Sequence, residues 1–80
     1  MDNDIEYETK DFFLSACILA TGAKITKVIR QEDKTCVFVF NITPDSAKEI
    51  IRKHWNNELL LPTRSLIDAI HELKSRIYES

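Results

Sequence analysis

Residues 35–42, Thr-Cys-Val-Phe-Val-Phe-Asn-Ile, form the stretch that decides the fold of this 80-residue chain. In an extended strand, the side chains at even positions from Cys36 to Ile42 lie on one face, and Val37 and Val39 lie on the other. A strand with one covered face alternates apolar with polar residues, whereas this strand is apolar on both faces. The pattern therefore predicts a strand that needs two covering surfaces.

Residues 24–31 precede this strand and are predicted to pair with it as a β-hairpin, through a turn at 31–34. Simple alternation places Ile25 and Ile29 on one face of residues 24–31 and Val28 on the other. Three charged side chains in this strand are typical of a sheet edge: Lys24, Lys27 and Arg30.

The first predicted helix covers residues 10–21, which are apolar almost all round and therefore indicate a deeply buried helix. Thr9 is the predicted N-cap, because its hydroxyl can accept a hydrogen bond from the first helical turn. Gly22, the only glycine, stands where a left-handed residue commonly ends a helix.

Two further helices follow the hairpin. Thr43-Pro44-Asp45 is a strong helix start, with Thr43 as N-cap and Pro44 at the first helical position, and this helix is predicted to run to about Asn56. The last helix is predicted over residues 64–78, with Thr63 as its N-cap and an apolar stripe at helical spacing.

The expected fold class is α+β, in the order helix, β-hairpin, helix, short strand, helix. The short strand is predicted at residues 58–61, because Pro62 restricts the preceding leucine to extended conformations. Residues 1–9 are predicted to form an acidic N-terminal arm, either frayed or paired as a short edge strand. Residues 10–80 are predicted to form a single small domain.

The charge of the chain is unevenly distributed. The first nine residues contain four acids and no base, at Asp2, Asp4, Glu6 and Glu8. From Lys10 onward there are 11 bases and nine acids, a balance of +2 within a chain of net charge −2. Bulk electrostatic binding to nucleic acid or to an anionic membrane is therefore not expected. The arm either keeps the chain in solution, or it covers a basic surface or mimics phosphate.

The sequence suggests no catalytic residue, cofactor or metal site, and we expect a protein that is not an enzyme. Cys17 and Cys36 both lie among apolar residues and are expected to be free thiols in the cytoplasm. The two cysteines and two histidines are separated by 17 to 19 positions, so no closely spaced metal ligands occur. No glycine-rich loop is present to hold a phosphate, and no apolar run predicts a membrane span.

Four bases are candidate contacts for an anion or a nucleic acid: Lys48, Arg52, Lys53 and Arg64. Arg64 lies at a helix start where an acid is usual, and an anion could bind the free N–H groups there. The alternative is an ordinary capped helix with Arg64 in solvent. Trp55 lies near these bases, but its spacing from Ile51 predicts that it is a core residue.

The candidate interaction surface is formed by Val28, Val37 and Val39, on the strand face opposite the phenylalanines. In one arrangement the middle helix covers these valines and the monomer has three layers. In the other, a second copy covers them and the chain is a homodimer, which is the arrangement we expect, because a small hairpin gains stability from association.

Four motifs complete the pattern: Tyr7-x-Thr9-x-Asp11-Phe12, Phe38-x-Phe40, Trp55-x-x-x-Leu59 and Leu73-Lys74-Ser75-Arg76-Ile77-Tyr78. Together they resemble a family of small proteins of unknown function from bacteria and their phages or mobile elements. The resemblance implies a phage-like accessory protein and assigns no site residue. We therefore expect a small non-enzymatic protein-interaction module. Its expected partners are a second copy of the chain, in a homodimer, and an unidentified protein. The alternative is a nucleic-acid-binding accessory protein that uses the Lys48, Arg52 and Lys53 face with Arg64.

Overall fold

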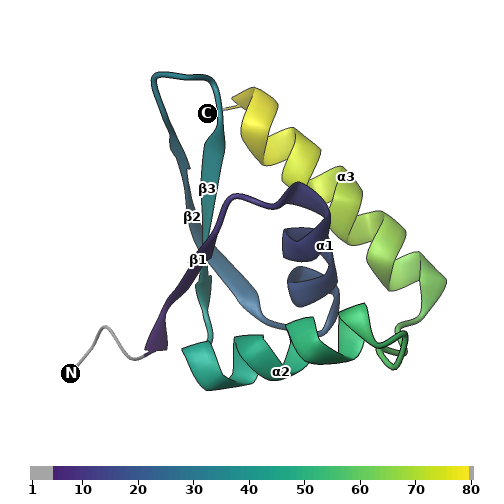
Figure 1. The fold of residues 1–80 in the computed structure, drawn as a ribbon. Helices are drawn as coiled ribbons and strands as arrows, with labels where there is room; N and C mark the ends of the chain where they lie inside the picture. Colours follow the sequence, from purple (N-terminus) through teal and green to yellow (C-terminus); the bar gives the residue numbers. More distant parts are fainter. Residues whose placement is uncertain (1–4, 80) are drawn as a thin grey trace.

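The computed structural model describes residues 5–79 of the chain, as three helices and a three-stranded antiparallel sheet (Figure 1). This arrangement confirms the predicted α+β class. The elements in chain order are β1 (Tyr7–Thr9), α1 (Phe12–Ala20), β2 (Lys24–Arg30), β3 (Cys36–Asn41), α2 (Pro44–Trp55) and α3 (Thr63–Glu79). Among the described helices, none is both long and apolar enough to cross a membrane.

β3, which comes from the apolar stretch at residues 35–42, lies at the centre of the sheet. The strand order is β1-β3-β2, with the predicted β2–β3 hairpin on one side and β1 antiparallel on the other. The acidic arm thus contributes a short edge strand, in which Tyr7 lies opposite Phe40. The strand predicted at residues 58–61 is wrong, because β1 occupies the remaining edge of β3. Residues 1–4, which hold the rest of the arm, lie outside the described residues.

A bulge in β2 changes which of its side chains face the core. The pairing shifts between Ile25 and Lys27, which leaves Thr26 as an extra residue that is not paired with any one residue of β3, although its hydroxyl donates to the Val39 carbonyl. One extra residue reverses the alternation beyond it, so Ile25 and Val28 both pack on the phenylalanine side. The predictions that Ile25 shares a face with Ile29, and that Val28 shares a face with the other two valines, are therefore wrong.

The core lies between the phenylalanine face of the sheet and the helices, as predicted. Phe38 and Phe40 are buried in one cluster with residues of α1 and α3: Leu14, Ala16, Ile18, Ala69 and Leu73. Figure 1 shows α1 and α3 on the same side of the sheet. Ile50 and Ile51 of α2 pack against the same cluster, so all three helices share one core.

The opposite face of β3 is closed without a helix. Val37 is 8% exposed and Val39 is fully buried. Because the apolar residues of α2 pack on the phenylalanine side, α2 does not form a third layer over the valines, which was the alternative to the expected homodimer. The cross-strand neighbours of the valines are Ile29 beside Val37, and Lys27 and Glu8 on either side of Val39. In the described part of the chain, the valines are thus flanked by side chains of the neighbouring strands β1 and β2.

The helix ends follow from local hydrogen bonds. The carboxylate of Asp11 accepts a hydrogen bond from the Leu14 N–H at 3.0 Å, so Asp11 is the N-cap of α1 and the prediction of Thr9 is wrong. Thr9 belongs to β1 instead, where pairing with β3 takes it out of the helix. Gly22 has a φ of 111°, which confirms its predicted role after the helix.

The starts of α2 and α3 differ in how closely they match the prediction. The Thr43 hydroxyl accepts a hydrogen bond from the Ser46 N–H, and Pro44 follows as the first helical residue, both as predicted. The Pro62 carbonyl accepts from the Leu66 N–H at 3.2 Å, so α3 already includes Thr63. The predicted cap is therefore one residue too late.

Candidate binding surface

The connection between α2 and α3 is a tight turn built around Asn57. Asn57 has a φ of 60°, in the left-handed region that asparagine tolerates better than most residues. Its N–H donates to the His54 carbonyl at 3.2 Å, and the Glu58 N–H donates to the Lys53 carbonyl at 2.8 Å. This pair of bonds is the Schellman arrangement, which uses the free carbonyls of the last helical turn. We call residues 54–66, together with Cys17, the α2–α3 corner.

A pocket of about 300 Å³ opens at the α2–α3 corner. It is lined by residues from all three helices and the connection: Cys17, His54, Asn57, Leu59, Leu61 and Leu66. Small-molecule sites range from roughly 300 to 1,000 Å³, so this pocket is at the small end of that range. Its size and leucine walls suit one apolar side chain better than a cofactor.

A thiol and an imidazole meet in this pocket. The Cys17 Sγ lies 3.9 Å from the His54 Nδ1, although the two residues are 37 positions apart in sequence. Burial raises the pKa of the Cys17 thiol, and the negative charge of Asp11 raises it further. A thiol that holds its proton is a weak nucleophile, so the pair does not have the character of an activated cysteine.

The surface beside the pocket exposes two large apolar side chains. Trp55 is 70% exposed and Leu60 is 89% exposed. The Trp55 ring lies edge-on to the His54 ring, with their centroids 5.0 Å apart. The prediction that Trp55 is a core residue is wrong, because the buried side of α2 passes from Ala47 through Ile51 to His54, one position earlier.

The four predicted basic residues are only partly brought together. Arg52 is bound by two carboxylates, Glu49 at 2.7 Å and Glu58 at 3.5 Å. The hydrogen bond to Arg52 lowers the pKa of Glu49, and the same bond raises the pKa of Arg52. Lys53 precedes the corner and Arg64 lies in the first turn of α3, whereas Lys48 lies about 10 Å from Trp55 along α2.

Three of these bases have no ion pair within residues 5–79, namely Lys48, Lys53 and Arg64. The first turn of α3 also contains no acid, as the sequence indicated. Lys53 and Arg64, which form no ion pair in the described chain, therefore precede and follow the exposed Trp55 and Leu60 in sequence.

The predicted valine surface is divided by the structure. Val28 packs against the main core, opposite Phe38, while Val37 and Val39 lie on the other face of the sheet. Because Val37 and Val39 are buried, they present little apolar area to a partner.

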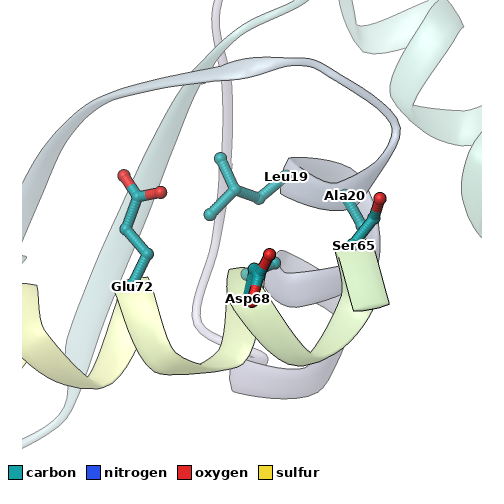
Figure 2. A pocket seen from close by; sticks show the side chains of 6 residues that line it. Leu19, Ala20, Ser65, Asp68 and Glu72 are labelled. Carbon is teal, nitrogen blue, oxygen red and sulfur yellow. The ribbon is translucent and has the colours of Figure 1, made fainter. Parts of the chain in front are cut away.

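A second groove lies between α1 and α3 (Figure 2), with a volume of about 280 Å³. Leu19 and Ala20 line it from α1, and Ser65, Asp68 and Glu72 line it from α3. Glu72 accepts hydrogen bonds from Arg76, the nearer at 3.0 Å. In the described residues, no group of three or more acids, histidines or cysteines could hold a metal ion. Asp68 and Glu72 give the groove a mildly acidic lining.

A family model for a domain of unknown function, DUF5659, matches residues 4–79. The chain belongs to the DUF5659 family. This confirms the expectation of a family of unknown function, and the match covers every element of the fold. No curated protein and no solved structure matches the chain. Membership in DUF5659 assigns no activity, so a function has to be argued from the surface described above.

Proposed function

We propose that this DUF5659 chain is a small non-enzymatic protein-interaction module, whose binding surface is the α2–α3 corner. The observation that carries the proposal is the exposure of Trp55 and Leu60 next to a leucine-lined pocket. Tryptophan is among the residues most often found as energetic anchors of protein interfaces. Covering each of these two side chains would contribute about 2 kcal/mol to binding.

The character of the pocket supports binding rather than catalysis. The Cys17 thiol is held neutral by burial, and the pocket pairs it only with His54 as a titratable group. Nucleophilic catalysis uses an activated nucleophile, a base and an orienting group that converge on one point. A neutral thiol among leucines instead serves as one more apolar wall.

The test is capture of proteins by the immobilised chain, comparing a corner variant with a control. Trp55→Ala/Leu60→Ser removes the exposed apolar side chains, while Tyr78→Ala removes an aromatic ring that is 82% exposed elsewhere, near the end of α3. We expect proteins retained by the unmodified chain and by Tyr78→Ala to be lost from the corner variant. Equal retention by all three would overturn the assignment of the corner.

Nucleic-acid binding is the second candidate, and the exposure of Trp55 is the observation that favours it. Lys48, Arg52 and Trp55 follow the spacing of one helix face, and exposed aromatic rings among bases can stack on nucleobases. The net charge of −2 and the two carboxylates on Arg52 make it the weaker candidate. A gel shift with a single-stranded oligonucleotide tests it, and no shift at low salt would exclude it.

The proposal includes self-association, a cytoplasmic location and an accessory role in a phage or mobile element. A domain of this size gains stability from association. Cys17 and Cys36 are free, which suits a reducing compartment, and the accessory role rests on the motif resemblance. Light scattering tests the first of these, because a mass of 9.3 kDa at high concentration would mean that the chain is a monomer.

A further inference from the structure

We infer that the α2–α3 corner binds the acidic N-terminal segment of a second copy of this chain. In this arrangement Ile5 enters the leucine-lined pocket, and Asp4 and Glu6 face Lys53 and Arg64. The inference rests on the proposed function, and it names the partner of that surface as another molecule of the same protein.

The N-terminal segment has the chemistry that such a surface requires. Ile5 is 51% exposed and stands between two acids, Asp4 and Glu6. The first nine residues contain four acids and no base. The C-terminal part of the segment is held in place by the pairing of β1 with β3, which begins at Tyr7, two residues after Ile5. The segment therefore offers one apolar anchor flanked by negative charge.

The corner, together with the part of α2 that precedes it, is complementary in charge. Residues 48–64, which begin in α2 before the corner and end in its α3 side, contain four bases and two acids, an excess of two positive charges. Both acids, Glu49 and Glu58, are bound to Arg52, so Lys53 and Arg64 have no ion pair within the described chain. The first turn of α3 lacks the acid that a helix start favours, and an acid from another molecule could take that place.

The pocket is complementary in size and polarity. Its volume of about 300 Å³ and its leucine walls suit one branched aliphatic side chain. Because the Cys17 thiol keeps its proton, the pocket presents no buried negative charge to Ile5. An apolar residue is favoured there over a charged one, which would lose its hydration without a partner.

Ile5 does not lie at the corner of its own molecule. Ile5 lies beside the end of β3 from which the chain enters α2, as the pairing of Tyr7 with Phe40 shows. The 12 residues of α2 separate that point from Trp55 by about 18 Å. Figure 1 shows β1 near the start of α2 and the corner at its end. The contact is therefore between molecules.

Sedimentation velocity over a range of concentrations tests the inference on the full chain. We expect association at low salt that weakens at high salt, because the bases of the proposed contact, Lys53 and Arg64, are exposed. Asp4→Asn/Glu6→Gln should weaken association on the order of tenfold, as expected when two exposed ion pairs are lost. Glu32→Gln/Glu72→Gln removes the same charge away from the corner and should leave association unchanged. A monomer at all concentrations, or equal effects of the two variants, would overturn the inference.

A peptide of residues 1–8 provides a second measurement. Trp55 is the only tryptophan, so its fluorescence reports directly on the corner. The peptide should shift this emission, and the same peptide with Ile5→Ser should not. No shift, or an equal shift with both peptides, would refute the self-contact. The proposed function would then still stand if the corner variant lost captured proteins in the capture experiment, so the two proposals can fail separately.

Discussion

Cys17 is a residue whose surroundings hold it in its protonated form. Burial and then the charge of Asp11 raise the pKa of the thiol above its ordinary value of 9.0. The unfolded chain therefore loses this proton first as the pH rises, and the folded state loses stability relative to it from about pH 9 upward. Urea unfolding at neutral and at alkaline pH should show this loss. Cys17→Ala should show a smaller decrease, and an equal decrease in both proteins would contradict the assignment.

Trp55 allows a second prediction at the same scale. Because its ring is exposed, Trp55→Ala should change the free energy of unfolding by no more than about 0.5 kcal/mol. Leu73→Ala, at a fully buried position, should cost about 2–5 kcal/mol. Chemical denaturation followed by circular dichroism measures both. A loss near 3 kcal/mol for Trp55→Ala would restore the core position that helical spacing predicted.

The error over Trp55 shows what single-residue reasoning lacks. Helical spacing from Ile51 fits both His54 and Trp55, and hydrophobicity alone favours Trp55 for the core. The structure places His54 inward, where it meets Cys17 from a helix 37 positions away. Nothing in the local pattern indicates that contact, so both the pocket and the exposed ring beside it were missed. The basic residues of the same surface were found, because charge is visible in the sequence.

At the scale of elements, the turn at Asn57 sets the position of the corner. Asn57→Gly should preserve the turn, because glycine adopts a positive φ without steric cost. Asn57→Val should destabilise the protein by about 1–2 kcal/mol, because a β-branched side chain is disfavoured in the left-handed region that asparagine tolerates. Thermal unfolding of the two variants provides the comparison. Equal stability of the two would show that the left-handed turn does not constrain the connection.

The elements also divide into those with local signals and those without. The β2–β3 hairpin and α2 were predicted because alternation, a turn and Thr43-Pro44 are adjacent in sequence. The bulge at Thr26 was missed, because an extra residue leaves the composition of a strand unchanged and only shifts its pairing. The sequence offers two places for a third strand, residues 58–61 and the N-terminal arm, and does not decide between them, because a three-residue strand such as β1 acquires its identity only from pairing with β3.

At the scale of the whole molecule, β1 forms one edge of the sheet by pairing with β3, and it should be essential to stability. A chain that starts at Lys10 loses the partner of one edge of β3 and the packing of Tyr7 against the core. We expect this chain to be less stable by about 2–4 kcal/mol, from the lost burial and ladder hydrogen bonds. A small domain has little stability in reserve, so partial unfolding at room temperature is the expected result.

A chain that starts at Ile5 is the matched control for this truncation. It lacks Asp2 and Asp4 but keeps β1, so its unfolding midpoint in urea should stay close to that of the full chain. If the two shortened chains were equally stable, β1 would contribute nothing and residues 1–9 would be only a solvating arm. If only the chain from Lys10 is destabilised, the acidic residues before Ile5 are free to serve an intermolecular contact. The same pair of chains thus separates the structural part of the N-terminal segment from the part available for binding.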